Sequence, residues 1–292
     1  MNILLTGATG FLGSNLLTRL VEDGHKVTLL VRKTSSLQRI THLIDRITIH
    51  TIGDIPFREL FYSGKIEVII HCATNYGRGG VEPPELVDAN LILPLQLLQA
   101  GFDSGVHCFI NTDTILDKSV SDYALSKSQF REWLGTYAQK MVCVNIALEH
   151  FYGSHDDPTK FVSFIVRQLL NNVDCINLTM GEQRRDFIYI DDIVSAFLLI
   201  IDNSTSSKTG YFDYEIGTGV TITIREFVEL AKHIVLNTQT QLNFGALPYR
   251  ENEAMEIAVN TAAIRDLGWI PATSLTNGLS KMVEQEREKR TT

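Results

Sequence analysis

The sequence predicts an α/β fold built on a doubly wound parallel β-sheet, and three features of the chain support this prediction. Apolar runs of strand length alternate with amphipathic stretches through the first half of the chain. A glycine-rich turn separates the first apolar run from the first amphipathic stretch. After about residue 150 this alternation is replaced by a less regular order of elements. The alternation is typical of βαβ units with helices on both faces of a sheet, and the change indicates a smaller α/β lobe.

The expected elements follow the apolar pattern in chain order. In the first half, strands are expected at 2–6, 26–31, 47–51, 67–72, 107–111 and 141–147. Helical stretches are expected between them, at 11–23, 36–44, 56–63, 85–101 and 123–138. In the second half, helices are expected at 161–170, 191–202, 223–236 and near the C-terminus, and strands at 211–216 and 241–245. The strand at 211–216 can return to the main sheet.

The composition limits the classes of partner. The 292 residues carry a net charge of −8, from 26 basic and 34 acidic side chains, so no global positive field would attract a nucleic acid. No signal peptide and no apolar run of transmembrane length is present, so we expect a cytoplasmic protein that does not bind a membrane. The cysteines lack metal-ligand spacing and are expected to be buried free thiols in a reducing compartment, with no metal bound; they are Cys72, Cys108, Cys143 and Cys175.

The glycine-rich turn predicts a binding site for the pyrophosphate of a dinucleotide. Gly7, Gly10 and Gly13 lie between the first strand and the first helix. Gly7 allows a tight turn, Gly10 allows backbone N–H groups to approach the pyrophosphate, and Gly13 allows close packing of the helix on the strand. The backbone of Thr9, Phe11 and Leu12 completes the predicted contact.

The spacing of these glycines, together with Thr6 and the run Ala8–Gly13, resembles the short-chain dehydrogenase/reductase superfamily. The resemblance is to its extended branch, the NAD-dependent epimerase/dehydratase family, which modifies nucleotide sugars. It implies a Rossmann-type dinucleotide-binding domain formed by residues 1–150 and about 187–218. It also implies a discontinuous substrate-binding lobe formed by about 151–186 and 219–292.

A phenol and an ammonium group on one helix face form the predicted catalytic pair. Tyr123 and Lys127 are four residues apart, so a helix places them on the same side, where the cation would lower the pKa of the phenol. The resemblance assigns a catalytic hydroxyl to Thr112, at the end of the fifth strand. Thr114 is the alternative, because both threonines alternate onto the same side of that strand.

The end of the second strand predicts the cofactor. Where relatives that prefer NAD have an acidic residue, this chain has Arg32 and Lys33, which can pair with a 2′-phosphate. We therefore expect NADP(H). The same resemblance assigns further cofactor contacts to Asp54, Ile55, Cys72, Ala73, Thr74 and Asn90, although turn or cap roles are the alternatives for Asp54 and Asn90.

Separate cations are expected to bind the anionic part of the substrate. Arg185, before Asp-Phe, and Arg250, in Pro-Tyr-Arg-Glu, match the arginines that clamp a nucleotide diphosphate in the family. Lys160 is a further candidate. Asn75, Tyr76 and Arg78 follow the fourth strand, at the sheet edge where ligands bind, although a surface loop is an equal alternative there.

These residues predict NADPH-dependent reduction of the C4 ketone of a nucleotide-linked 4-keto-6-deoxy sugar, with a CDP-linked sugar favoured. The pattern resembles enzymes that make CDP-linked abequose and paratose for bacterial surface polysaccharide, including lipopolysaccharide O-antigen. The alternatives are an NDP-sugar 4-epimerase with tightly bound NAD, a reductase of small ketones, and a non-catalytic NADP-binding sensor. The resemblance also implies a homodimer formed through the helices at 85–101 and 123–138.

Overall fold

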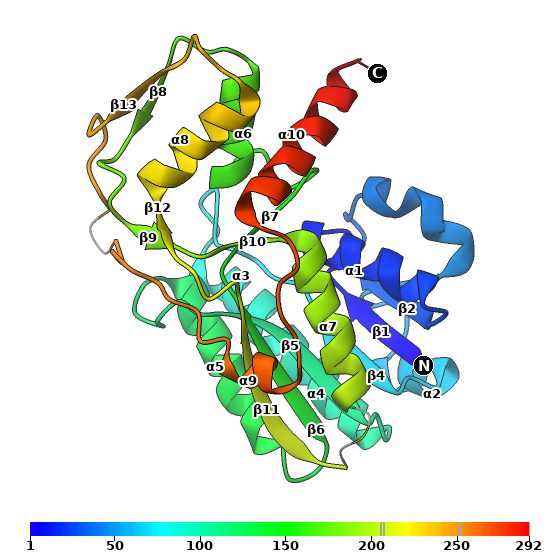
Figure 1. Cartoon of the computed structure of the whole chain (residues 1–292). Helices are drawn as coiled ribbons and strands as arrows, with labels where there is room; N and C mark the ends of the chain where they lie inside the picture. The colour runs from blue at the N-terminus through cyan, green and yellow to red at the C-terminus, as the bar shows by residue number, and fades with distance from the viewer. Residues whose placement is uncertain (205, 207, 251–252, 292) are drawn as a thin grey trace. The chain divides into compact units, whose positions relative to one another are not determined.

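The computed structural model describes residues 1–204, 206, 208–250 and 253–291. The chain forms two compact units, and neither is a single continuous segment (Figure 1). The first unit contains Met1–Leu148 and Val194–Glu215, and the second contains Glu149–Ile193 and Ile216–Thr292.

The first unit is built on a seven-stranded sheet with the order β11-β6-β5-β4-β1-β2-β3. The neighbouring strands from β6 to β3 are parallel, which confirms the predicted fold class. The strand order reverses beside β1, and in such sheets ligands bind at the carboxyl ends of the strands near the reversal. The strands are β1 (Asn2–Thr6), β2 (Lys26–Val31), β3 (Thr48–Thr51), β4 (Val68–His71), β5 (Cys108–Thr114), β6 (Val142–Leu148) and β11 (Gly210–Ile216).

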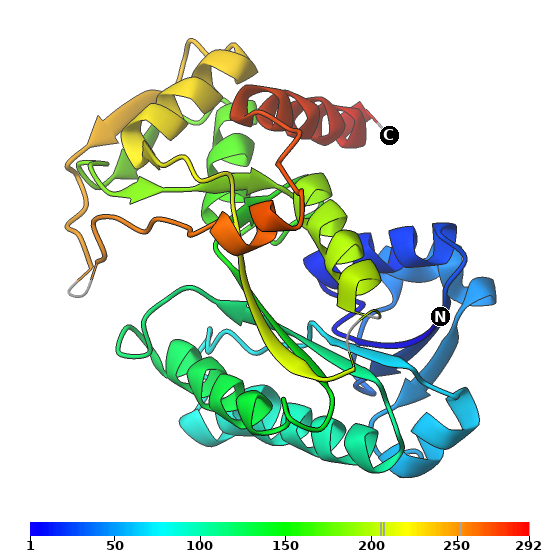
Figure 2. The same ribbon diagram turned by 60° about the horizontal axis from the view of Figure 1, so that its bottom comes forward.

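Helices cover both faces of this sheet. Figure 2 shows α1 and α7 on one face and α4 and α5 on the other. Leu97 of α4 and Phe130 of α5 belong to a buried cluster with Phe109 of β5, so this helix layer is held by apolar packing. The helices are α1 (Phe11–Glu22), the 3₁₀ helix η1 (Gln38–Arg46), α2 (Phe57–Gly64), α3 (Pro83–Val87), the π-helical turn η2 (Asp88–Ile92), α4 (Leu93–Asp103), α5 (Asp122–Thr136) and α7 (Ile190–Ser204).

The second unit contains short sheets and helices. Its strand pairs are β10 with β7, β12 with β9, and β13 with β8. These strands are β7 (His150–Tyr152), β8 (Cys175–Leu178), β9 (Arg184–Arg185), β10 (Phe187–Tyr189), β12 (Ile222–Thr223) and β13 (Gln241–Phe244). The helices are α6 (Phe161–Leu170), α8 (Ile224–Val235), α9 (Ala262–Asp266) and α10 (Leu275–Thr291).

Buried carboxylates tie the loops of the second unit together. The Asp186 carboxylate accepts hydrogen bonds from the Thr218 hydroxyl at 2.7 Å and the Gly219 N–H at 2.7 Å. The Asp192 carboxylate accepts from the N–H groups of Ala272 at 2.9 Å and Thr273 at 3.0 Å. Each buried carboxylate therefore holds a separate loop of the second unit through two hydrogen bonds.

The four free cysteines do not share one environment. Cys108 and Cys143 are buried and Cys72 is partly buried, but Cys175 is exposed. The expectation that all four thiols are buried was therefore wrong for Cys175, because β8 exposes alternate residues and Cys175 lies on the exposed side. Within the part of the chain that the structure describes, no helix has the length and apolar character needed to cross a membrane.

Candidate active site

The first βα turn packs directly against the end of β4. Gly7 has a φ of 71°, and a Cβ there would lie 2.5 Å from the Ala73 nitrogen. A Cβ on Gly13 would lie 2.2 Å from the Gly7 carbonyl oxygen. Gly10 is the N-cap of α1 and has no side chain to cap it, so the first N–H groups of the helix are open to an external anion. This arrangement fits the pyrophosphate of a dinucleotide cofactor.

Hydrogen bonds join the ends of β1 and β4 beside this turn. The Ala73 N–H donates to the Thr6 hydroxyl at 3.2 Å, and the Cys72 N–H donates to the Thr6 carbonyl at 3.2 Å. The Thr6 hydroxyl also lies 2.8 Å from Nδ1 of the buried His71. These hydrogen bonds fix the path of the chain after β4, so that Cys72 and Ala73 pack against Gly7 and Thr74 follows them.

Asn90 connects this loop to α5. Its side chain is fully buried in the π-helical turn η2. The Asn90 Oδ1 accepts from the Asn75 N–H at 2.8 Å and from the Thr74 hydroxyl at 3.3 Å. The Asn90 Nδ2 donates to the Asn75 carbonyl at 2.8 Å and to the Ser126 hydroxyl at 3.0 Å. The Asn90 side chain therefore holds the loop through the backbone groups of Asn75, which is more than the helix-cap role considered for it.

The predicted catalytic pair lies on α5. Ser121 caps this helix by accepting a hydrogen bond from the Ala124 N–H at 3.2 Å. Tyr123 lies in the first turn and is partly buried. Lys127, one turn later, is 1% exposed, and its Nζ has no hydrogen-bond partner among the residues that the structure describes. A buried ammonium without a partner is costly, so this nitrogen is ready to bind a polar ligand.

The two candidate threonines have different partners. The Thr112 hydroxyl donates to the His71 carbonyl at 3.0 Å, which joins β5 to β4. Thr114 and Thr74 instead form side-chain hydrogen bonds with Tyr123. The structure thus brings Thr114 to the phenol, whereas the role of Thr112 as the catalytic hydroxyl stays a prediction.

The protein alone does not lower the pKa of the phenol. Burial is the main effect and raises the pKa of Tyr123, and the hydrogen bonds from Thr74 and Thr114 oppose it. Burial also lowers the pKa of Lys127, and the Asp113 carboxylate opposes that shift. The expectation of a lowered phenol pKa was therefore wrong for these residues by themselves, because burial outweighs the hydrogen bonds that favour the phenolate.

Tyr76 lies against Tyr123, with ring centroids 5.2 Å apart and an interplanar angle of 40°. The Arg78 guanidinium carbon lies 5.4 Å from the centroid of the Tyr76 ring. The loop after β4 therefore places the Tyr76 ring beside the Tyr123 ring and the Arg78 guanidinium beside the Tyr76 ring.

The residues predicted to select the cofactor lie in exposed turns. Arg32 and Lys33 follow β2, and the Ser35 N–H donates to the Arg32 carbonyl at 2.9 Å. Asp54 closes a turn after β3, where its carboxylate accepts from the Thr51 N–H at 3.3 Å. Ile55 forms an isolated bridge with Ile52 in the same turn. Asp54 therefore has the turn role that was the alternative to a cofactor contact. Arg32 and Lys33 both lie exposed after the end of β2.

The basic residues of the second unit are not equivalent. Arg185 is 6% exposed, and its guanidinium pairs with the Glu253 carboxylate at 2.5 Å. Arg250 is exposed, and its carbonyl accepts from the Glu253 N–H at 3.1 Å. Lys160 pairs with the buried Asp156 at 3.0 Å. Arg185 and Lys160 already have carboxylate partners, so a diphosphate would exchange with these carboxylates or share their cations.

Asp113 and Arg131 form an ion pair near the predicted catalytic residues, and neither was predicted to belong to the site. The Arg131 Nε lies 2.9 Å from the Asp113 Oδ2, and the Asp113 side chain is fully buried. The sequence alone could have placed Arg131 on the same helix face as Tyr123 and Lys127, because the three residues follow one another at four-residue intervals. The position of Asp113 beside that helix face depends on the fold.

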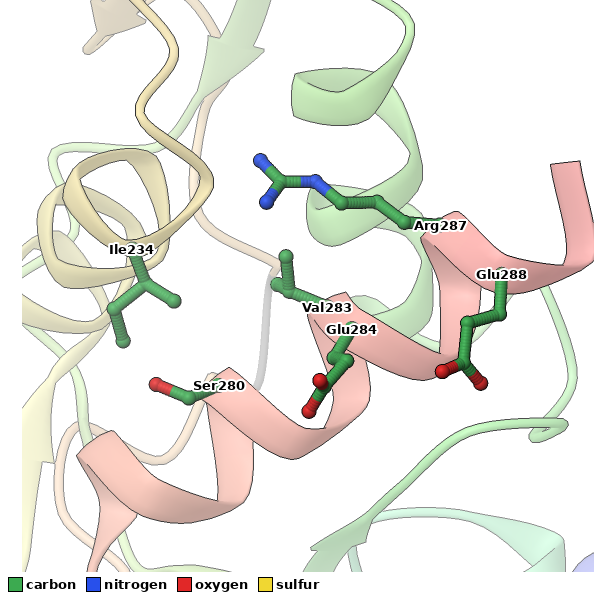
Figure 3. Close-up of a pocket in the computed structure, with 6 residues that line it drawn as sticks. All are labelled: Ile234, Ser280, Val283, Glu284, Arg287 and Glu288. Carbon is green, nitrogen blue, oxygen red and sulfur yellow. The ribbon is translucent and has the colours of Figure 1, made fainter. Parts of the chain in front are cut away.

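A pocket of about 440 Å³ lies between α8 and α10 (Figure 3). None of the predicted site residues lines it; the lining residues are Ile234, Ser280, Val283, Glu284, Arg287 and Glu288. Among the described residues, no group of three or more His, Cys, Asp or Glu side chains is arranged to hold a metal ion.

Residues 3–217 match the model of the NAD dependent epimerase/dehydratase family. The chain belongs to this family. Membership of the NAD dependent epimerase/dehydratase family makes the protein an enzyme of the extended short-chain dehydrogenase/reductase type, whose members depend on a nicotinamide cofactor.

Relatives of the family extend this similarity over the whole chain. A CDP-abequose synthase from Salmonella muenchen is 34% identical, with 97% of each chain covered. A UDP-glucose 4-epimerase from Thermotoga maritima has a TM-score of 0.86 and 24% identity, covering 99% of this chain and 100% of that one. A UDP-glucose 4-epimerase from Stenotrophomonas maltophila, solved with bound NAD, has a TM-score of 0.87 and 18% identity, with 100% of each chain covered. The two structures confirm the fold.

Proposed function

We propose that this protein is a cytoplasmic NADPH-dependent reductase of the C4 ketone of a nucleotide-linked 4-keto-6-deoxy sugar, with a CDP-linked sugar as substrate. The observation that carries the proposal is the α5 face, where Tyr123 lies beside Thr114 and Tyr76, and where the buried Lys127 nitrogen has no hydrogen-bond partner among the described residues. The similarity to a CDP-abequose synthase supports the choice of a CDP-linked sugar and a role in bacterial surface polysaccharide synthesis.

The residues have separate roles in this proposal. NADPH supplies the hydride when it is bound. Tyr123 donates its phenolic proton to the carbonyl oxygen as the ketone becomes an alcohol, so the reaction consumes one hydride and one proton. Lys127 holds the ribose of the cofactor and stabilises negative charge on the phenol. Thr112 or Thr114 donates a hydrogen bond that orients the carbonyl.

The cofactor and diphosphate contacts follow from charge. Arg32 and Lys33 would pair with the 2′-phosphate, and the first turn of α1 would bind the pyrophosphate. In the second unit, Arg185 and Arg250 would bind the diphosphate of the substrate, with Lys160 as a further cation. We accordingly propose the first unit as the dinucleotide-binding domain and the second as the substrate-binding lobe.

The first test measures NADPH oxidation with a panel of CDP-, dTDP-, UDP- and GDP-linked 4-keto-6-deoxy sugars, followed at the nicotinamide absorbance band. We expect turnover with the CDP-linked sugar, and a loss of at least about 100-fold in Tyr123→Phe. Tyr62→Phe is the matched control, because Tyr62 is 86% exposed on α2. Near-normal turnover by Tyr123→Phe would refute the assigned proton donor.

Two further variants test the anion contacts. Arg32→Ala should weaken NADPH binding by about tenfold or more and leave NADH binding unchanged, since one charge-assisted contact is lost. Arg185→Ala should raise the KM for the nucleotide sugar, whereas Arg290→Ala on the exposed end of α10 should not. Unchanged affinity in Arg185→Ala would remove the support for a diphosphate.

The second candidate function is an NDP-sugar 4-epimerase that retains NAD. The family description and the structural similarity to UDP-glucose 4-epimerases support it. An epimerase would be purified with bound NAD and would act without added cofactor. The same substrate panel therefore separates the two functions: turnover that consumes NADPH supports the reductase, and turnover without cofactor supports the epimerase.

We also propose a homodimer formed through α4 and α5. Exposed apolar side chains support this, since Trp133 and Leu125 of α5 are 49% and 41% exposed and Ile92, before α4, is 39% exposed. Leu125 and Trp133 are eight residues apart and lie on the face of α5 opposite Lys127. Sedimentation should show a dimer for the protein and a monomer for Trp133→Glu.

A further inference from the structure

A row of polar side chains crosses the buried middle of the seven-stranded sheet. One register line across β1, β4, β5 and β6 contains Thr6, His71, Asn111 and Asn145. Residues paired across neighbouring strands project to the same side, so these four side chains share one face of the sheet. Each of them is at most 1% exposed. Buried polar groups are costly without partners, so the hydrogen bonds along this polar row matter for the fold.

The polar row ends in a carboxylate at the sheet edge, and that end sets the direction of its hydrogen bonds. Asp213, exposed on β11, accepts from the Asn145 Nδ2 at 2.9 Å. The Asn145 Oδ1 in turn accepts from the Asn111 Nδ2 at 2.9 Å. An ionised carboxylate offers only acceptors, so it requires the Nδ2 of Asn145 on its side. That choice turns the Asn145 oxygen toward Asn111 and the Asn111 oxygen away from Asn145.

The opposite end of the polar row lies beside the glycine-rich turn. The Thr6 hydroxyl oxygen accepts from the Ala73 N–H at 3.2 Å and lies 2.8 Å from the His71 Nδ1. Ala73 itself packs against Gly7. Burial lowers the pKa of His71 well below its usual value, so the imidazole is neutral and carries a single ring N–H hydrogen. That hydrogen lies either on Nδ1, facing Thr6, or on Nε2.

Two buried atoms in the middle of the polar row have no hydrogen-bond partner among the described residues. They are the His71 Nε2 and the Asn111 Oδ1, and the two residues are register partners on β4 and β5. An amide oxygen can only accept, so it favours the imidazole hydrogen on Nε2. The His71 Nδ1 is then an acceptor for the Thr6 hydroxyl, whose oxygen still accepts the Ala73 N–H.

We propose that the polar row is one directional series of hydrogen bonds, through which Asp213 fixes the tautomer of His71 and the direction of the Thr6 hydroxyl. Asp213 is thus a positioning residue for the ends of β1 and β4, although β6 and β5 lie between β11 and β4 in the sheet. The proposal does not depend on the proposed reaction, because the whole row lies within the first unit.

A donor in place of the carboxylate should reverse the series. Asp213→Lys presents an ammonium, which only donates, so Asn145 has to turn its oxygen toward position 213 and its Nδ2 toward Asn111. The Asn111 Nδ2 then faces His71, and the imidazole hydrogen moves to Nδ1. The Thr6 oxygen then accepts two hydrogens, and its own hydroxyl hydrogen loses the His71 acceptor. With the loop beside Gly7 held less well, affinity for the nicotinamide cofactor should fall by about two- to fivefold.

The experiment records long-range ¹H–¹⁵N NMR spectra of the protein labelled with [¹⁵N]histidine, because the protonated and unprotonated nitrogens of a neutral imidazole give well-separated signals. His71→Asn identifies the His71 signals. Glu215→Lys is the matched control, since it adds the same ammonium two residues further along the same side of β11. The expected result is a hydrogen on Nε2 in the unmodified protein and in Glu215→Lys, and on Nδ1 in Asp213→Lys. A hydrogen on Nδ1 in the unmodified protein, or an unchanged tautomer in Asp213→Lys, overturns the proposal.

Fluorescence titrations with NADPH and with NADH complete the test. Binding by Asp213→Lys that equals binding by Glu215→Lys, despite a reversed tautomer, would overturn the positioning role of Asp213. If Asp213→Lys does not fold, the tautomer in the unmodified protein still decides the direction of the series. The expected tautomers in a protein without reductase activity would support the proposal and count against the proposed function.

Discussion

Asn90→Ala tests whether one buried amide holds the loop after β4 in place. The substitution removes the hydrogen bonds to the Asn75 N–H, the Asn75 carbonyl and the Ser126 hydroxyl, at 2.8, 2.8 and 3.0 Å. Each such bond contributes about 1 kcal/mol of net stability, so the free energy of unfolding should fall by about 3 kcal/mol. For a domain of this size that corresponds to a loss of roughly 6–12 °C in Tm.

The assay is thermal unfolding followed by circular dichroism, together with fluorescence titration of NADPH. Asn243→Ala is the matched control, because its amide donates a single exposed hydrogen bond, to Asn177 at 3.1 Å, and its Tm should change by no more than about 1–2 °C. Binding of the nicotinamide cofactor should weaken in Asn90→Ala as well, since Thr74 and Asn75 lose their anchor. A Tm and an NADPH affinity equal to those of the unmodified protein would refute the reasoning.

The remaining predictions concern packing, capping and pH. Gly13→Ala places a methyl group 2.2 Å from the Gly7 carbonyl oxygen and should cost about 1–3 kcal/mol and weaken binding of the nicotinamide cofactor. Gly135→Ala, with open space around it inside α5, should instead raise stability by up to about 1 kcal/mol in the same melts. Thr223→Ala removes the capping box of α8 and should cost about 1 kcal/mol in urea unfolding; no change would contradict the role of that cap. Buried His71 has a pKa well below 6.5 in the folded protein, so the unfolded chain binds more protons, and stability should fall as the pH drops below about 6.5. Urea titrations from pH 7.5 to 5.0 should show this slope, and its persistence unchanged in His71→Asn would contradict the assignment.

The sequence was sufficient for features that depend on neighbours along the chain. The glycines at 7, 10 and 13 predicted the first turn, and the alternation of apolar runs predicted the parallel sheet. The four-residue spacing of Tyr123 and Lys127 predicted a shared helix face because both residues lie within α5. These patterns are local, and the physical rules that produce them act over a few residues.

Features that join distant residues could not be predicted in this way. Glu253 pairs with Arg185 across 68 positions of the sequence. The contact of Asp113 with Arg131 requires a buried carboxylate on β5 to face a helix that begins at Asp122. The pKa of Tyr123 depends on burial of its side chain in the folded protein, whereas the sequence showed only the nearby cation.

The discontinuity of the first unit has a consequence for its synthesis. β11 borders β6 in the sheet, yet its residues are made only after the whole of Glu149–Ile193. During translation the nascent chain therefore carries β6 as an open edge until Gly210–Ile216 leaves the ribosome. Ribosome pausing or truncation within that interval should expose an apolar strand to chaperones and to other nascent chains.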